Sequence, residues 1–377
     1  MKQKTTETPV ALVQTAPGKR HPFSAVEQYT PLLTPETRLY ASLYEGIPII
    51  SAAIARIIRL VGGFSVQCPD AADTKGLAEF LRTVPFGSCA KGIDVFVASY
   101  LRQMLLYGTG VAEIVLDQSR MDIAGLYQAG IGDVVLREHP QDPMQVQVCR
   151  REAGQCVPAK RQDLLLVTPL DPDPERPFGT SLLFSLPFVS SVLLKIYQSE
   201  KVNFDRVGNL RFAVTCKPSE GSVGNRERAK QIAQEWSKAM RGEDGVSDFI
   251  ALGDVDIKVI GADNQVLDCE IPARQMTEQI VARLGLPPFL LGLSWSTSER
   301  MSTQQADLLT SELEAYRRAL EPVIRRICTL WLALHGASEQ CTVVWNDISL
   351  QDLTEQAKAE LYRAQADKIR AEMGKGE

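Results

Sequence analysis

"GLPPFLLGLSWSTSERMS", residues 285–302, lies between two stretches whose apolar residues recur with helical spacing. Pro287 and Pro288 end the first of these helices, because proline lacks an amide hydrogen and its ring clashes with the preceding turn. A short apolar run then ends at Gly292, and the residues after it are mostly serine and threonine around Trp295. The stretch therefore predicts a sharp turn, started by Gly285, and then an exposed polar loop between two long helices.

The helix after this loop is predicted to begin after Ser302, which has Gln305 three residues later in a capping-box arrangement, and to continue to Gly336. At 1.5 Å of rise per residue it would be about 50 Å long. Pro322 lies inside the pattern and is expected to kink the helix or to remove one hydrogen bond. One side of the helix is apolar and comprises Leu309, Leu313, Tyr316, Leu320, Val323, Ile327 and Leu330.

Two further helices are predicted before the turn, at residues 186–207, where Gly208 is the stop signal, and at about 266–284. Between them, residues 209–263 show the pattern of a strand, a helix and two more strands. "NLRFAVTC" has the composition of a strand, residues 225–241 have helical spacing, and "DFIALGDVDIKVI" predicts a hairpin. The segment therefore predicts a compact insert between two helices.

The N-terminal half predicts helices followed by hairpins. Residues 36–62 have helical spacing, and Pro48 is expected to break this helix into two pieces. A second helix, within residues 93–110, stops at Gly108 and turns into the strand "VAEIVLD". Shorter strands follow at "DVVLRE", "MQVQVCRR" and "DLLLVTPL". Because these strands do not alternate with helices, the fold class is predicted to be α+β.

Composition excludes several classes of protein. The 377 residues are 45% apolar and 23% charged, which is typical of a globular chain. A net charge of −5 excludes a protein whose whole surface is basic and binds nucleic acid electrostatically. Residues 1–30 are polar and resemble a loosely held arm, without the apolar core of a signal peptide. The most apolar stretch, residues 46–66, is interrupted by Arg56 and Arg59, so we expect a buried helix and no membrane association.

The sequence contains no catalytic or metal-binding motif. We find no P-loop, HExxH, G-x-S-x-G or G-x-G-x-x-G pattern, and the three histidines are far apart with no CxxC pair nearby. No catalytic residue, metal site or cofactor is therefore predicted, and the chain is not expected to be an enzyme. A hydrolase that uses the Ser and Asp of "GTSLLFS" and "GDVDIK" is the alternative. The acidic "DPDPE" is interpreted as a solvated loop, because its prolines favour an exposed turn.

Two groups of residues leave alternatives open. Cys149 and Cys156 flank "RREAGQ", a predicted hairpin, and are either free thiols or a cross-strand disulfide. The second group comprises four arginines in the long helix, which either contact phosphate or an acidic partner or belong to a solvated face balanced by glutamates. They are Arg317, Arg318, Arg325 and Arg326.

The order of these parts resembles the portal proteins of tailed bacteriophages. "FGTSLL" precedes a long helix, the insert follows, and a second helix ends in "ARLGLPPFLLG" before the serine-rich loop and the very long helix. "YLRQMLLYGTGVAEIVLD" is similar to the helix-to-strand element of that family. The resemblance covers roughly residues 35–350. This chain departs from the family at Leu182, where a proline usually follows the serine, and in its short C-terminal end.

The resemblance implies a domain layout. The parts of a portal subunit are called wing, stem, clip, channel loop and crown. They would correspond to a wing at 1–185, stem helices at 186–208 and 264–292, a clip at 209–263, a channel loop at 293–302, the long helix and strand of the wing at 303–350, and a reduced crown helix at 351–377.

The resemblance also implies a function. Portal proteins form a ring, usually twelvefold, at one capsid vertex, and double-stranded DNA passes through its centre during packaging and ejection. The implied partners are further copies of the chain, non-specific DNA, the terminase large subunit that acts as motor, a head–tail connector, the major capsid protein and a scaffold protein. The chain would belong to the virion, and to the host cytoplasm during assembly. Another ring-forming capsid or tail component is a further alternative.

Residues of the opening stretch would then face the channel. Ser294, Ser296, Thr297 and Ser298 can bond phosphates without sequence preference, and Arg300 would supply one positive charge per subunit. Trp295 would either narrow the bore or pack against a neighbouring subunit. The turn that leads into the loop would comprise Gly285, Pro287, Pro288 and Gly292.

Overall fold

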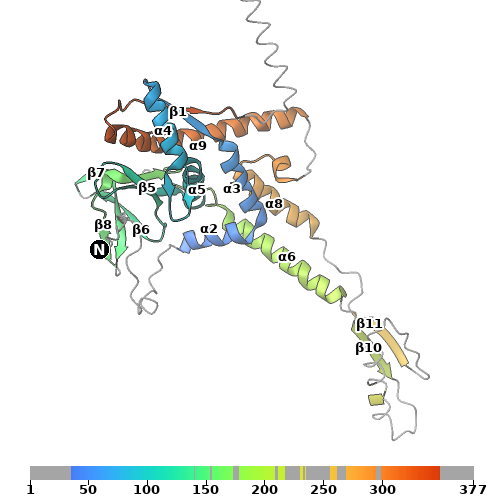
Figure 1. The fold of residues 1–377 in the computed structure, drawn as a ribbon. Helices are drawn as coiled ribbons and strands as arrows, with labels where there is room; N and C mark the ends of the chain where they lie inside the picture. Colours follow the sequence, from blue (N-terminus) through green and yellow to red (C-terminus); the bar gives the residue numbers. More distant parts are fainter. Residues whose placement is uncertain are drawn as a thin grey trace, which may run out of the picture. The chain divides into compact units, whose positions relative to one another are not determined.

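The structure is a computed structural model, and its ribbon is shown in Figure 1. The chain divides into two compact units, residues 1–190 with 278–377 and residues 191–277. The fold is mixed α and β, as predicted. The residues that the structure describes are 35–139, 141–152, 155–172, 178–208, 211–216, 230–231, 234, 255–260, 269–293 and 299–348.

Two helices of the first unit meet at a sharp bend. α2 (Pro35–Gly46) and α3 (Pro48–Val61) are inclined by 97°, because Pro48 occupies the first turn of α3 and Ile47 before it is extended. The predicted break is therefore confirmed. Within the described ranges, no single helix has the length and apolarity of a membrane span, although α2 and α3 meet that criterion as a pair by length and composition alone. The buried face of α3 comprises Ile50, Ala53, Ile54, Ile57 and Val61.

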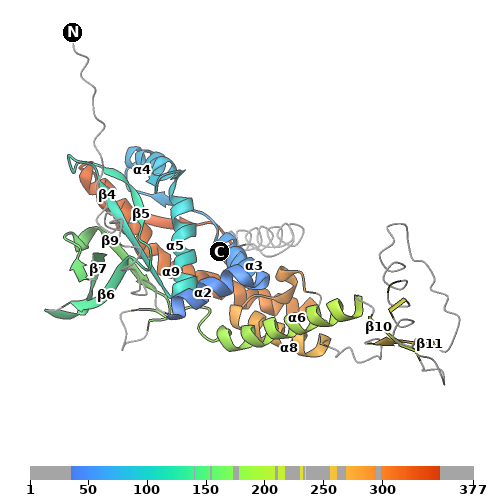
Figure 2. The ribbon, with the colours of Figure 1, turned by 90° about the horizontal axis from the view of Figure 1, so that it is seen from below.

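A five-stranded sheet follows, with the strand order β3-β2-β5-β4-β9. Its longest strand, β4 (Thr109–Leu116), begins one residue after α5 (Ile93–Tyr107) and pairs antiparallel with β5 and β9. α5 packs on β4 and β5, as Figure 2 shows. Gly108, at φ 79°, is the residue at which the helix becomes a strand, as the sequence predicts. The remaining strands are β2 (Pro85–Phe86), β3 (Ala90–Lys91), β5 (Ile123–Gln128) and β9 (Leu165–Pro169).

A second sheet is a meander of β6 (Val134–His139), β7 (Asp142–Glu152) and β8 (Gln155–Pro158). The predicted hairpin at "RREAGQ" is the β7–β8 pair. Its register sets Cys149 opposite Pro158 and Cys156 opposite Arg151, and both thiols are free. Side chains from this sheet pack with residues from β4 and from the end of β5 in one buried cluster of Val111, Ala129, Val134, Leu136 and Val148.

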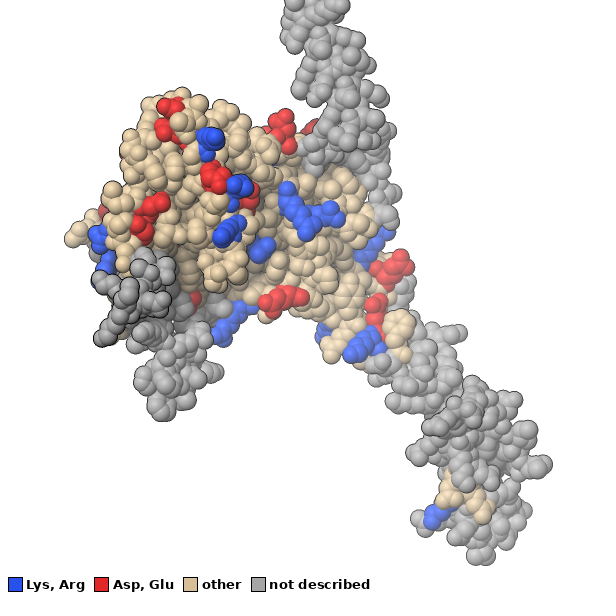
Figure 3. Space-filling model, in the orientation of Figure 1, with Lys and Arg blue, Asp and Glu red and all other residues tan. Residues whose placement is uncertain are grey.

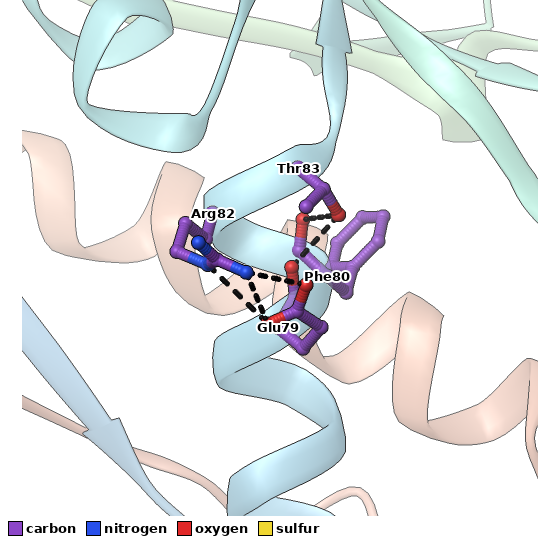
Figure 4. Close-up of polar contacts among 4 residues, drawn as sticks. All are labelled: Glu79, Phe80, Arg82 and Thr83. Carbon is purple, nitrogen blue, oxygen red and sulfur yellow. Dashed lines mark hydrogen bonds and ion pairs between the residues drawn. The ribbon is translucent and has the colours of Figure 1, made fainter.

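The helix α4 (Ala71–Thr83) was not predicted, because its sequence is mostly polar. Asp70 caps its first turn by accepting a hydrogen bond of 2.7 Å from the amide of Ala72. Near its end, Arg82 pairs with Glu79, and the hydroxyl of Thr83 donates to the main-chain oxygen of Glu79 (Figure 4). Phe80 lies between these residues and stacks on Trp331 of the long helix, with ring centroids 5.5 Å apart.

The long helix α9 runs from Glu299 to Leu334 and contacts α3, α4, α5 and β9. Its predicted start after Ser302 is wrong by about one turn. The first residues of α9 are polar and carry no apolar periodicity, so the sequence pattern marks only where the buried part begins. Pro322 lies inside the continuous helix, and its kink stays a prediction. Of the seven predicted face residues, all but Leu330 are buried.

The strand expected after the long helix, within 303–350, is β12 (Thr342–Trp345), which pairs antiparallel with β1 (Phe64–Gln67). The two strands come from opposite ends of the described chain and form a separate two-stranded sheet. α9 packs against β12.

The helix α6 (Leu186–Gly208) begins in the first unit and continues into the second, close to its predicted bounds. The second unit also contains β10 (Arg211–Cys216), which pairs antiparallel with β11 (Val255–Ile260) over six residue pairs. α8 (Glu270–Leu284) ends where predicted but begins four residues later than expected. Most of the predicted helix at 225–241 and the first strand of the predicted hairpin lie outside the described residues.

Candidate functional site

The glycines of the "YGTG" and "FGTS" stretches bring two distant chain segments into contact. The amide of Gly179 donates to the hydroxyl of Thr109 over 3.0 Å, and the amide of Leu170 donates to the carbonyl of Gly108 over 2.7 Å. A Cβ atom on Gly108 would overlap the main chain of Gly179 and Ser181, and one on Gly179 would overlap Gly108 and Leu170. Both positions therefore need glycine because two backbones approach closely there.

Ser181 fastens this junction to the end of α5. Its side chain is buried, and its hydroxyl donates to the carbonyl of Leu106 over 2.7 Å while it accepts from the amide of Leu183 over 3.0 Å. The amide of Leu182 donates to the carbonyl of Leu105 over 3.0 Å. The serine thus satisfies a carbonyl group at the C-terminus of α5 that would otherwise lack a partner. Since the hydroxyl is occupied and buried, Ser181 is not an exposed nucleophile.

Arg283 ties the end of α8 to the same junction. Its Nε donates to the main-chain oxygen of Leu182 over 3.0 Å, and its second guanidinium nitrogen donates to that of Ser181 over 3.3 Å. Arg283 was not among the predicted site residues, although it stands in the quoted "ARLGLPP" element. A cation in the last turn of a helix next to a turn signal was the available clue.

The turn after α8 is built from the residues that the sequence singles out. Gly285 has φ 68°, and Pro287 leads into a short 3-10 helix (Pro288–Leu291) that ends at Gly292 with φ 76°. The amide of Leu293 donates to the carbonyl of Pro288 over 3.1 Å, which closes the turn. Two left-handed glycines and two prolines therefore reverse the chain within one short stretch.

The channel-loop residues Ser294, Trp295, Ser296, Thr297 and Ser298 lie outside the described residues. Arg300 falls in the first turn of α9 and not in a loop, so the predicted loop at 293–302 is shortened at its C-terminal end. The predicted capping role of Ser302 is wrong, because α9 begins at Glu299 and Ser302 lies inside the helix.

Arg317 belongs to neither of the two proposed classes of arginine. It is buried, and both Nε and one terminal nitrogen donate to the carbonyl of Val61, over 2.9 and 2.7 Å. Its guanidinium lies over the ring of Trp345, 5.1 Å from the ring centroid. Burial lowers the pKa of Arg317 from its ordinary value. The residue therefore caps the C-terminus of α3 and joins it to β12.

The other three arginines fit the solvated interpretation or a structural contact. Arg318 and Arg325 are exposed and lie near Glu314 and Glu321, one turn before them on α9. Arg326 donates to the main-chain oxygen of Asp163 over 3.0 Å. On the face drawn in Figure 3, basic and acidic side chains of the described residues are interspersed without a continuous basic area.

Large apolar side chains are exposed along α6 and just before it. Phe188 and Phe204 are each 76% exposed, and both hydrophobic and charged residues face solvent in the second half of the helix. The exposed apolar set comprises Phe184, Phe188, Leu194, Tyr197, Val202 and Phe204. Among the described residues, no three His, Cys, Asp or Glu side chains are grouped so that they could hold a metal ion.

Comparisons with solved structures identify this architecture. A chain from the neck of an empty gene transfer agent particle, computed with C6 symmetry, matches with a TM-score of 0.65 and 16% identity, over 91% of this chain and 93% of that chain. A chain from the neck of the native particle, computed with C12 symmetry, matches with a TM-score of 0.63 and 16% identity, over 88% and 89%. Together with the motifs of the sequence, these matches decide the fold. It is a phage portal-type fold.

The predicted resemblance to portal proteins is therefore confirmed at the level of the fold. A crystal structure of an HK97-family phage portal protein from Corynebacterium diphtheriae is a weaker match, with a TM-score of 0.44 and 12% identity over 81% of this chain and 94% of that chain. No protein-family model matches the sequence, and no curated protein gives a significant match. Within the portal-type fold, the Ser181 junction is the point at which α5, α6 and α8 are connected.

Proposed function

We propose that this chain is the subunit of a portal ring that conducts double-stranded DNA. The observation that carries the proposal is the exposed apolar set on α6 within a portal-type fold. Several large apolar side chains that are exposed along one helix mark an interaction surface. The surface suits a neighbouring copy of the same chain.

The ring is proposed to be cyclic and twelvefold. The neck of the native gene transfer agent particle, whose chain shares this fold, was computed with C12 symmetry. A closed ring requires a head-to-tail interface, in which one face of each subunit fits a different face of the next. The apolar residues of α6 would form one of these faces, and each copy would bury them once.

The channel is proposed to be narrowed by the segment that follows the 285–292 turn. Gly285, Pro287, Pro288 and Gly292 fix the direction in which the chain leaves α8, and Arg300 lies at the beginning of α9. Serine and threonine hydroxyls can bond phosphates without reading the base sequence. In a ring, one arginine per subunit would become a belt of positive charge around the axis, although the net charge of each chain is −5.

The remaining parts follow the portal layout. The wing would comprise 1–185 and 303–350, the stem 186–208 and 264–292, the clip 209–263 and the reduced crown 351–377. The clip would bind the terminase large subunit during packaging and a head–tail connector afterwards. The wing would contact the major capsid protein, with a scaffold protein during assembly. The complete ring would reside in the virion after assembly in the host cytoplasm.

The ring is proposed to have no catalytic activity of its own. The sequence lacks a phosphate-binding loop, so a separate motor would supply the work of packaging. The hydrolase alternative receives no support from Ser181, because its hydroxyl is buried and bonded to the end of α5. Ring formation alone would not separate a portal from another ring-forming capsid or tail component. Passage of DNA through the ring would separate the two.

The proposal is tested by imaging the purified full chain. Mass photometry should show particles of about 500 kDa, twelve times the chain mass of 41.6 kDa, and negative-stain images should show rings with a central hole. If the chain alone is monomeric, a second arm of the experiment repeats the measurement after a capsid scaffold protein has been added. A chain that stays monomeric in both arms would overturn the proposal.

A further inference from the structure

Three thiols converge at one end of the β1–β12 sheet. Cys68 directly follows β1, Cys341 directly precedes β12, and Cys328 lies on α9, which packs against β12. Cys328 is fully buried, whereas Cys68 and Cys341 are partly exposed, and all three are free. Cys68 and Cys341 line a surface hollow of about 480 Å³ together with Arg325 and Glu339. Small molecules from solvent can therefore reach this thiol cluster.

The register of the two strands brings Cys68 and Cys341 opposite each other. Gln67 pairs with Thr342, so the next pair outward is Cys68 with Cys341. At the other end, the amide of Asn346 donates to the carbonyl of Gly63 over 3.0 Å, which makes Gly63 and Asn346 a hydrogen-bonded pair. Hydrogen-bonded and non-hydrogen-bonded pairs alternate along an antiparallel ladder. Counting along the ladder, Cys68 and Cys341 occupy a non-hydrogen-bonded position.

Independent contacts agree with that assignment. The amide of Cys68 donates to the hydroxyl of Thr74 over 2.9 Å, and its carbonyl accepts from the same hydroxyl over 3.3 Å, so its backbone is engaged away from β12. In a non-hydrogen-bonded pair the Cα atoms are about 4.5 Å apart and the side chains are closer than elsewhere in the ladder. This separation lies within the range in which a disulfide can form.

The two thiols also share a face of the sheet. Side chains alternate along a strand, so Cys68 lies on the face of Val66, and Cys341 lies on the face of Val343. Both valines are buried. Arg317 of α9 packs on Trp345, at the other end of this sheet. Cys328 comes eleven residues, or about three helical turns, after Arg317 and therefore lies on nearly the same face of α9. The thiol cluster therefore lies between the sheet and α9.

Charge and hydrogen bonding favour Cys341 as the reactive member. The thiol of Cys328 donates to the sulfur of Cys341, and this hydrogen bond, aided by the charge of Arg325, lowers the pKa of Cys341 from its ordinary value. Burial raises the pKa of Cys68. The thiolate is the nucleophilic form of cysteine, so the first attack should come from Cys341.

We propose that Cys68 and Cys341 form a reversible thiol–disulfide pair that closes the open end of the β1–β12 ladder, with Cys341 as the attacking thiol. The oxidant is a small disulfide of the glutathione class. The thiolate of Cys341 attacks one sulfur of glutathione disulfide, which forms a mixed disulfide and releases one glutathione thiolate. The thiolate of Cys68 then attacks the sulfur of Cys341 and releases the second. The protons of the two protein thiols end on the two glutathione molecules.

The site acts as a clamp between distant parts of the chain. β1 and β12 are joined by four residue pairs, so a covalent bond at their end would hold a short sheet together. A reductant would reopen it. The inference does not depend on ring formation, because it concerns groups within one described unit.

The test maps disulfides in the full chain. Reduced protein is incubated with glutathione disulfide, its remaining thiols are alkylated, and its peptides are analysed by mass spectrometry without reduction. We expect a peptide pair joined through Cys68 and Cys341, lighter by two hydrogen atoms, and a higher Tm that returns to its starting value with dithiothreitol. Cys341→Ser should abolish the pair, and Cys68→Ser should leave glutathione on Cys341.

Cys89→Ser is the matched control, because Cys89 is an exposed thiol outside the cluster and its removal should leave the Cys68–Cys341 pair unchanged. Two results would overturn the proposal: no cross-linked peptide in the unsubstituted chain, or a bond between Cys328 and Cys341 in its place. These are read from the unsubstituted protein, so they hold even if a serine variant fails to fold.

Discussion

Arg283 donates a hydrogen bond of 3.0 Å to the main-chain oxygen of Leu182, although 101 residues separate the two in the chain. Leu182 and Ser181 are in turn bonded to the carbonyls that end α5. One arginine therefore connects the end of α8 to the end of α5 and to the segment that enters α6. The turn at 285–292 starts from this fixed point.

Substitution of Arg283 should loosen the junction. Arg283→Ala is expected to lower the free energy of unfolding by about 1–3 kcal/mol, because two main-chain oxygens lose a charged donor. Arg283→Lys should recover part of the loss, since an ammonium group cannot present the two nitrogens of the guanidinium fork. Urea unfolding measures both. Arg318→Ala, which breaks an exposed ion pair, is the control and should change stability by less than about 1 kcal/mol. Equal losses in both variants would refute the role of Arg283.

Gly108→Ala should destabilise the chain more than Gly336→Ala. Both glycines have positive φ, 79° and 71°, so both variants suffer left-handed strain of about 1–2 kcal/mol. A Cβ atom at Gly336 would meet open space, whereas at Gly108 it would overlap the main chain of Gly179. Gly108→Ala should lower the free energy of unfolding by more than Gly336→Ala does, and we expect the difference to exceed about 1 kcal/mol. This difference measures the cost of the overlap between the two segments. Thermal unfolding of the two variants compares them, and similar Tm values would contradict the packing argument.

Local signals in the sequence predicted the parts of the fold that depend on neighbouring residues. Pro48 breaks a helix, Gly108 turns a helix into a strand, and the two prolines after Gly285 end α8, because each acts on its own backbone. These signals needed no knowledge of distant partners. The order of such elements was enough to predict the fold class and the portal resemblance.

The remaining features depend on partners far away in the chain. β1 has four residues and pairs with β12 across most of the sequence, which no local pattern reveals. α4 buries only Leu77 and Leu81, so its apolar periodicity is weak. Arg317 is the same residue type as its exposed neighbour Arg318. The two differ in their contacts, because Arg317 is bonded to the carbonyl of Val61 and lies over the ring of Trp345.

Arg317→Lys should therefore be far more damaging than Arg318→Lys. Lysine at position 317 would lose one of the two hydrogen bonds to Val61 and the planar contact with Trp345, and it would bury a strongly hydrated charge. We expect a loss of about 2–4 kcal/mol in the free energy of unfolding, against less than about 0.5 kcal/mol for the exposed residue. Urea unfolding monitored by tryptophan fluorescence checks both. Similar stabilities would show that Arg317 is not a structural cap.

The buried phenol of Tyr316 should make stability depend on alkaline pH. Burial raises the pKa of Tyr316 to about 12, above the value of about 10 in an unfolded chain. The neutral side chain therefore stabilises the fold fully below pH 10, and this contribution is lost as the pH rises from about 10 towards about 12. Tyr316→Phe should have a smaller decline over that window than the unsubstituted chain. Urea titrations at several pH values test this, and parallel declines would refute it.

Replacement of exposed apolar residues on α6 should block ring assembly without unfolding the subunit. Leu194→Ser and Phe204→Ser remove apolar surface that is already exposed in the single chain, so the Tm of the monomer should stay within a few degrees of its starting value. Each copy would bury these side chains in the proposed ring, and their loss repeats at every interface around it. The fraction of particles near 500 kDa in mass photometry should fall by at least tenfold for the double variant, which corresponds to about 1.4 kcal/mol.

Met121→Ser is the matched control for this experiment. Met121 is 66% exposed in the turn between β4 and β5, so Met121→Ser removes one exposed apolar side chain at a site outside α6, and it is compared with each single α6 variant. Rings should form normally from this variant. If Met121→Ser prevents assembly as strongly as the α6 variants do, general solubility and not the α6 surface controls oligomerisation. If the double α6 variant still forms rings, the neighbouring subunit must contact another face of the chain.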